Sequence, residues 1–458
     1  MARKLRPTRP RRHRGLRLSI PGVALPLLGL LVLIQASSLR SPLSESEAPL
    51  AIAVRYPTRG LAAESPPPQS AAATAVARVG GNVLGTSEFR LRALGVFVGC
   101  AALGLLVWLG ERLFSTRAGV LAAVVLIATP AGRALLGTEF GVEPFYLLTM
   151  ILALGAIRNL SNERRSLIHA GIAGGAAIAL VGPSATWIPM MAVLWLRRLR
   201  GLTWRSFAIA VAVPVATAVV FAVLSGLALG VAPLPLPASL PPPGMSIVEF
   251  SLEALQLIPF TPLVLLGFWN VPKAWRRQGS PRYMSRWIFL TAAALLLFGA
   301  FSPLWVALSM VLALASSWAV GRAQRAPIAA AVGASVALGL VFNSFGGQAP
   351  GFDVDRWAVR ETGKFLRRNL DATSVIGAPP AARSRLVYYA TRTIAPLGAD
   401  APDLGGLDYV VVDRSKVDGV SPAAGATSRP PREFTLYGHR LQVVAEFGSW
   451  ILARVIEA

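Results

Sequence analysis

The chain has 458 residues, of which 54% are hydrophobic and 15% charged, and its formal net charge is +23. A soluble domain carries about a quarter charged residues, so this composition excludes an ordinary soluble protein and predicts a surface that faces lipid. The arginines cluster at the ends of apolar runs, which indicates membrane loops rather than a nucleic-acid-binding surface. One cysteine and three scattered histidines show no metal-ligand spacing, and we expect neither a metal nor a cofactor.

The N-terminus combines a basic tail with an apolar run. Residues 1–17 hold eight Lys/Arg and no acid, and the apolar stretch 18–35 follows. A cleaved signal peptide, a retained first helix and a nucleic-acid-binding tail all fit this pattern. We favour a cytoplasmic tail and a retained helix, because many apolar segments follow and need an orienting first span.

The apolar segments predict an all-α polytopic membrane domain over residues 18–342, with about eleven transmembrane helices and a first outer loop at 36–90. After that loop, the expected spans are 93–110, 118–135, 142–157, 167–182, 185–196, 206–230, 252–270, 287–301, 303–320 and 327–342. Loops on the side of the N-terminus carry 24 Lys/Arg, whereas the opposite loops up to residue 342 carry 7. Basic loops stay in the cytoplasm, so we expect a multi-pass protein of the cytoplasmic (inner) membrane with an extracytoplasmic C-terminus.

Charged residues return after the last span and predict a small extracytoplasmic α/β domain over residues 343–458. The stretch "DVDRWAVRETGKFLRRNL" is typical of an amphipathic helix with Trp357, Val359, Phe365 and Leu366 on or near one face. The stretches "TSVIGAPP" and "LDYVVVDRS" indicate buried strands, and "LQVVAEFGSWILARVIE" indicates two strands joined near Gly448.

Three acids in predicted outer segments are candidates for chemistry. Glu45 and Glu47 lie in "SESEAPL" of the first outer loop, and Glu143 lies in "GTEFGVEPFYLL" at the outer end of a span. A carboxylate beside the bilayer is costly unless it faces a cavity or a partner, which favours a functional role. The alternatives are solvated loop charges for the pair and a helix-dipole interaction for Glu143.

The stretch "LGTSEFRLR", with Gly85, Ser87, Glu88 and Arg92, lies at the end of the first outer loop. The region that begins there resembles the polyprenyl-phosphate-sugar glycosyltransferases of the GT-C fold. This group includes the protein O-mannosyltransferases and the lipid A aminoarabinose transferases. "LGTSEFRLR" supplies the matching Gly85, Ser87, Glu88 and Arg92, and "GERLFSTRAGVLAAVVL" continues the match. The similarity covers about residues 83–200, and "LVYYATRTIAP" resembles the outer domain of the same enzymes.

The resemblance also assigns roles, with departures at several positions. The family's first outer loop carries Asp-Glu-Ala followed by Tyr, with the Asp as the expected catalytic base. Here Glu47 and Ala48 match, but Ser46 replaces the Asp and Leu50 the Tyr. The resemblance therefore implies a catalytic acid/base role for Glu47, with Glu45 as a substitute.

The other carried-over positions concern the second acid and the donor phosphate. Glu143 matches the family's second acidic site with Glu for Asp. Val181 replaces a family lysine before Gly182–Pro183, and the lysine of the family's Lys-Pro-Pro-Leu motif is missing from "ESPPPQS". Arg92 and Arg55 are the candidates to contact the donor phosphate, because an arginine binds phosphate through a bidentate fork. For Arg92, an interfacial anchor is the alternative.

The resemblance implies a cell-envelope glycosyltransferase that moves a sugar from a polyprenyl-phosphate donor to an acceptor lipid, glycan or protein on the outer face of the membrane. A non-catalytic relative that keeps the fold as a binding or scaffold protein is the main alternative, since several motif residues are missing at once. A lipid-linked-sugar transporter is disfavoured, because ionisable residues are scarce within the predicted spans. The expected partners are the bilayer, the donor and the acceptor, with no nucleic acid.

Overall fold

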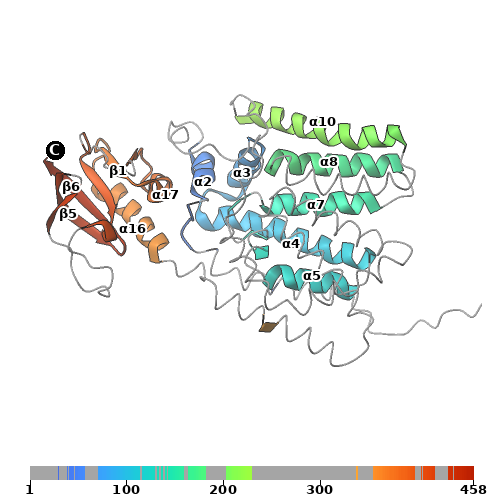
Figure 1. The fold of residues 1–458 in the computed structure, drawn as a ribbon, viewed down its shortest axis with the longest axis horizontal. Helices are drawn as coiled ribbons and strands as arrows, with labels where there is room; N and C mark the ends of the chain where they lie inside the picture. Colours follow the sequence, from blue (N-terminus) through green and yellow to red (C-terminus); the bar gives the residue numbers. More distant parts are fainter. Residues whose placement is uncertain are drawn as a thin grey trace, which may run out of the picture.

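The computed structural model consists of a helical bundle followed by a mixed α/β domain (Figure 1). The structure describes residues 29, 39, 41–45, 47–56, 71–113, 116–128, 132–133, 136–137, 140–141, 143–158, 163–181, 203–229, 337–338, 354–397, 404, 406–417, 432–436 and 438–457. The predicted basic tail, nearly all of the first helix, and the spans predicted at 185–196 and between 252 and 320 lie outside these residues. Of the last predicted span, at 327–342, only two residues are described.

The described part of the bundle is built from apolar helices, which are α2 (Ala48–Arg55), α3 (Ala71–Leu84), α4 (Glu88–Leu113), α5 (Thr116–Ala128), α7 (Glu143–Arg158), α8 (Glu163–Val181) and α10 (Trp204–Leu229). Two of them are long and apolar enough to cross a membrane, α4 over Glu88–Glu111 and α10 over Trp204–Ala228. Helices α5, α7 and α8 contain shorter apolar stretches. These five helices overlap five of the expected spans, and the total of eleven stays a prediction.

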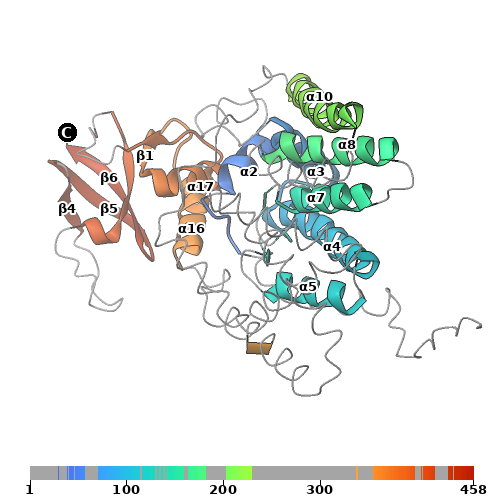
Figure 2. The same cartoon turned by 45° about the vertical axis from the view of Figure 1, so that its right-hand side comes forward.

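The long helices pack side by side in the order α10, α8, α7, α4 and α5 (Figures 1 and 2). Glycines bring α8 and α10 close together. A Cβ atom on Gly175 would lie 2.6 Å from the carbonyl oxygen of Pro214, and one on Gly171 would lie 2.8 Å from Cγ1 of Val213. Small residues four apart allow this approach between apolar helices. The outer side of α10 leaves Leu224 and Leu227 exposed, at 59% and 72%.

The C-terminal domain is a six-stranded sheet with two helices packed on one face. Its elements are α16 (Val354–Asn369), β1 (Ile376–Ala378), α17 (Pro380–Ala390), β2 (Ala395–Pro396), β3 (Tyr409–Asp413), β4 (Glu433–Leu436), β5 (His439–Phe447) and β6 (Trp450–Glu457). The strand order is β2-β1-β3-β6-β5-β4, with β1 parallel to β2 and β3 and the remaining neighbours antiparallel. The predicted helix, both predicted strands and the hairpin at Gly448 are confirmed.

One residue departs from the predicted buried face of α16. Val359 and Leu366 are buried and Phe365 packs beside them, whereas Trp357 is 40% exposed. Trp357 precedes Val359 by two residues, which places it about 200° away around the helix. The Arg360 guanidinium lies over the Trp357 ring, 5.0 Å from its centroid, so the aromatic ring is paired outside the core.

The core of the C-terminal domain continues into the first outer loop. Leu43 and Ile52 from the loop and α2 belong to the same buried cluster as Leu386 and Tyr388 of α17. Helix α17 lies against α2 in both views (Figures 1 and 2). Leu43 and α2, in the described part of this loop, therefore lie between the bundle and the C-terminal domain.

Candidate functional site

Glu47 lies immediately before α2, where a reciprocal pair of hydrogen bonds turns its carboxylate inward. The Ser44 N–H donates to Glu47 Oε2 at 2.7 Å, and the Glu47 N–H donates to Ser44 Oγ at 3.3 Å. The Ala48 N–H also donates to the Ser44 carbonyl at 3.1 Å, which extends the helical bonding back to Ser44. This is a capping box, the Ser-x-x-Glu arrangement that satisfies two N–H groups at a helix start. Glu47 is 1% exposed.

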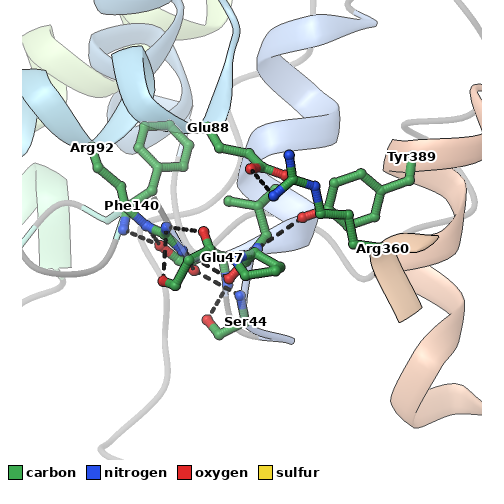
Figure 3. A network of polar contacts seen from close by, with 10 residues as sticks. Ser44, Glu47, Glu88, Arg92, Phe140, Arg360 and Tyr389 are labelled. Carbon is green, nitrogen blue, oxygen red and sulfur yellow. Dashed lines mark hydrogen bonds and ion pairs between the residues drawn. The ribbon is translucent and has the colours of Figure 1, made fainter. Parts of the chain in front are cut away.

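Arg92, near the start of α4, binds this carboxylate from the other side. Its Nε and Nη2 atoms donate to the two Glu47 oxygens at 2.7 and 2.6 Å (Figure 3). Nη1 donates to the carbonyl oxygen and hydroxyl of Ser41, and Nη2 also donates to the Pro42 carbonyl. All five N–H groups of the guanidinium are thus directed at protein acceptors. The sequence analysis predicted that Glu47 acts on the sugar acceptor and that Arg92 contacts the donor phosphate. In the structure the two side chains instead form one buried ion pair.

The segment before α7 supplies a third contact to the pair. The Phe140 N–H donates to Glu47 Oε1 at 2.5 Å. Leu136 and Gly137 of this segment pack closely against α4. A Cβ atom on Gly99 of α4 would collide with the Leu136 carbonyl, and Gly137, which has φ +93°, lies beside Gly95 of α4. Arg92, Gly95 and Gly99 recur at a spacing that places them on one helix face. The same face of α4 therefore holds both the guanidinium and the segment that carries Phe140.

These contacts determine the electrostatics of Glu47. Burial alone would raise the pKa of its carboxyl, but the Arg92 guanidinium and the N–H groups of Ser44 and Phe140 outweigh burial and lower the pKa below its usual value. The two oxygens accept four hydrogen bonds, which fills the acceptor positions of a carboxylate. In this arrangement Glu47 is ionised, and it can take a proton only by giving up one of these bonds.

The other predicted acids lie in more open surroundings. Glu45 is exposed, two residues before Glu47. Glu143 is half-buried at the first position of α7, where a negative charge suits the helix dipole. Its carboxylate folds back over Gly141, since a Cβ atom there would collide with it. Ser46, which replaces the family's Asp, lies outside the described residues.

Arg55, predicted to contact phosphate, lies at the junction with the C-terminal domain. Its guanidinium is 5.4 Å from the Tyr56 ring centroid and 4.9 Å from that of Tyr388. Burial raises the pKa of Tyr388 to about 12.

Arg78 of α3 donates to the Ala53 carbonyl at 3.1 Å. Within the described residues, no group of three or more His, Cys, Asp or Glu is arranged to bind a metal.

The structure adds contacts that the sequence analysis missed. Glu88 pairs with Arg360 of α16, with 3.6 Å between carboxylate oxygen and guanidinium nitrogen (Figure 3). The Tyr389 hydroxyl accepts a hydrogen bond from the Leu43 N–H at 2.9 Å. The Ser44-x-x-Glu47 spacing was a local signal for the capping box. No local signal marks the contacts of Phe140, Tyr389 or Arg360, because their partners are far away in the sequence.

Comparison with known structures defines the class of fold. No family model matches the sequence, and no curated protein is similar to it. ArnT from Cupriavidus metallidurans in the apo state is similar with a TM-score of 0.65 and 14% identity, over 94% of this chain and 98% of that chain. ArnT bound to undecaprenyl phosphate is similar with a TM-score of 0.59 and 15% identity, over 95% and 98%. The chain thus has the fold of ArnT, a GT-C enzyme, and the sequence-based resemblance is confirmed for the fold.

Proposed function

We propose that this chain is a membrane-embedded glycosyltransferase that moves a sugar from a polyprenyl-phosphate donor to an acceptor on the outer face of the cytoplasmic membrane. The observation that carries the proposal is the likeness to ArnT along almost the whole of both chains, including the form bound to undecaprenyl phosphate. The apolar helices α4 and α10 support a membrane location. The orientation, with the C-terminal domain outside the cell, rests on the distribution of Lys and Arg.

The reaction needs two kinds of side chain. The acceptor hydroxyl or amine attacks the sugar C1 while the bond from C1 to the phosphate oxygen breaks, and the leaving group is the polyprenyl phosphate. A carboxylate near the acceptor takes its proton as general base. Cations beside the phosphate stabilise the charge that develops on the leaving group.

Within this proposal the described acids take different roles. Glu47 organises the first outer loop, since its carboxylate already joins α2, α4 and the segment at Phe140. Glu45 and Glu143 are the carboxylates that we propose for taking the acceptor proton, because both are more exposed than Glu47. A direct catalytic role for Glu47 stays a prediction.

The cations that meet the phosphate follow the same reasoning. Arg92 and Arg55 stay the predicted contacts, and each would exchange a protein partner for a phosphate oxygen. For Arg92 the partners to be exchanged are the oxygens of Ser41 and Pro42. A bidentate Arg–phosphate contact would compensate for the lost hydrogen bonds.

Sugar transfer by the purified full chain in lipid tests the proposal, with a panel of radiolabelled polyprenyl-phosphate sugars as donors. We expect transfer by the unaltered protein and a loss of about 100-fold or more in Glu45→Gln or Glu143→Gln, whichever removes the base. Glu361→Gln is the matched control, because Glu361 is 51% exposed on α16 and pairs with Lys364. Transfer unaffected by both test variants would disprove the site assignment and leave the activity intact.

The main alternative is a non-catalytic relative that binds lipid-linked sugar. The saturated Glu47–Arg92 pair favours it, because neither side chain is open to a substrate in the described structure. Saturable binding of the same donors without turnover for any acceptor tried would support this alternative over the enzyme.

A further inference from the structure

The C-terminal domain contacts the first outer loop at the residues just before the capping box. The Tyr389 hydroxyl on α17 accepts the Leu43 N–H at 2.9 Å, although the two residues are 346 positions apart in the sequence. Leu43 is fully buried and lies directly before Ser44, whose N–H binds the Glu47 carboxylate. The adjacent N–H groups of Leu43 and Ser44 therefore connect a side chain of the C-terminal domain to the Glu47–Arg92 pair.

The same hydroxyl also reaches the start of α4. It lies beside the Glu88 carboxylate, which raises the pKa of the hydroxyl and pairs with Arg360 of α16 (Figure 3). Glu88 and Arg92 are four residues apart, and residues at that spacing share a helix face. Tyr389 thus binds the loop at Leu43 and lies near α4 at Glu88.

The Tyr389 hydroxyl is suited to accept the Leu43 N–H. Burial raises the pKa of this hydroxyl well above its usual value, and the Glu88 carboxylate raises it further. The group therefore stays protonated over the working pH range, and its oxygen accepts the Leu43 N–H. A phenylalanine at this position would keep the ring packing and lose the hydrogen bond from Leu43.

A neighbouring set of contacts fixes the same junction. The Tyr388 hydroxyl donates to the Thr86 carbonyl at 2.9 Å, and the Tyr388 ring lies under the Arg55 guanidinium. The rings of Tyr388 and Tyr389 meet edge to face, with centroids 5.1 Å apart. The two tyrosines thus hold α17 against the first outer loop, and the contacts of Tyr388 keep Tyr389 next to Leu43.

We propose that Tyr389 is a positioning residue for sugar transfer, which sets the location of the Leu43–Glu47 segment from the C-terminal domain. This inference rests on the proposed glycosyltransferase function. It gives the C-terminal domain a role in assembling the site, because the loop with Glu45 and Glu47 is held on one side by α4 and on the other by α17.

The test compares Tyr389→Phe with the unaltered full chain in lipid by two measurements. Amide hydrogen exchange of a peptide that contains Leu43 should become about fivefold faster, since the Leu43 N–H loses its acceptor. The kcat for sugar transfer should fall about tenfold, because a displaced acid costs rate. The KM for the polyprenyl-phosphate donor should stay within about twofold, as expected when the altered contact does not bind the donor.

Tyr409→Phe is the matched control, because it removes a hydroxyl from β3 of the same domain that makes none of these contacts. It should change neither the exchange of the Leu43 peptide nor kcat. Unchanged exchange in Tyr389→Phe would overturn the proposal, as would faster exchange with unchanged kcat, which would leave only a structural contact. Failure of the unaltered protein to transfer sugar would overturn the proposed function and the positioning role with it, and faster exchange in the same variant would still show that the hydroxyl holds the loop.

Discussion

Two ion pairs of nearly equal length lie in opposite environments in this protein. Arg92 and Glu47 are 2.6 Å apart and each is 1% exposed, whereas Arg440 and Glu433 in the β4–β5 hairpin are 2.7 Å apart and 57% and 43% exposed. An exposed pair contributes about 0–1 kcal/mol to stability. Removal of one partner from a buried pair costs about 3–5 kcal/mol, because an unpaired charge is left in the interior. Burial and the number of further hydrogen bonds, rather than distance, separate the two pairs.

The largest expected effect comes from breaking the buried pair. Arg92→Met leaves the Glu47 carboxylate buried without its cation, and we expect a loss of about 3–5 kcal/mol in the free energy of unfolding. Denaturant unfolding of the purified protein in detergent measures this loss. A loss under about 1 kcal/mol, the range of a surface pair, would contradict the described burial of the pair.

Acidification tests the buried pair through the Glu47 carboxyl. The pKa of the Glu47 carboxyl is lowered in the folded protein, whereas the unfolded chain titrates near the ordinary value of 4.5. The stabilisation from this group is therefore complete above pH 4.5 and is lost as the pH falls through the lower folded-state pKa. We expect the unfolding temperature to fall more steeply on acidification in the unaltered protein than in Glu47→Gln. In Glu433→Gln the slope should match that of the unaltered protein, and equal slopes in all three would refute the assignment.

The capping box tests the contribution of the local sequence to the buried pair. Ser44→Ala removes the hydroxyl that accepts the Glu47 N–H and leaves the ion pair in place. The expected cost is about 1 kcal/mol in the free energy of unfolding, the usual value for loss of an N-cap side chain. Denaturant unfolding again gives the measurement, with Ser44→Thr as the control that keeps a hydroxyl. Equal losses in the two variants would show that the hydroxyl does not cap α2.

The smallest expected effect lies at the exposed pair. Arg440→Met removes the same charge by the same substitution as Arg92→Met, but both partners in the hairpin already face water. We expect a change within about 0.5 kcal/mol in the free energy of unfolding. A loss above 2 kcal/mol would mean that the comparison between the pairs does not rest on burial.

The elements with a strong local period were predictable from the sequence. The helix at Val354–Asn369, the strand at Tyr409–Asp413 and the hairpin around Gly448 all follow apolar patterns that persist in the structure. Trp357 did not follow, because an exposed aromatic paired with Arg360 cannot be distinguished by hydrophobicity from one in the core. The order of the strands also could not be predicted, since β3 pairs with β1 and β6 across intervening segments.

The residues of the candidate site show the same difference between what local sequence predicts and what tertiary contacts decide. The sequence by itself determined an apolar, helix-rich chain with a C-terminal α/β domain, because composition and periodicity act over short range. It also singled out Glu47, Glu143 and Arg92 as positions of interest. Only the tertiary structure decided that Glu47 and Arg92 bind each other, that Phe140 binds Glu47, and that Tyr389 binds Leu43 beside them. The physical reason is that a buried charge takes its character from groups brought beside it by folding, and these partners lie 45, 93 and 346 residues apart along the chain.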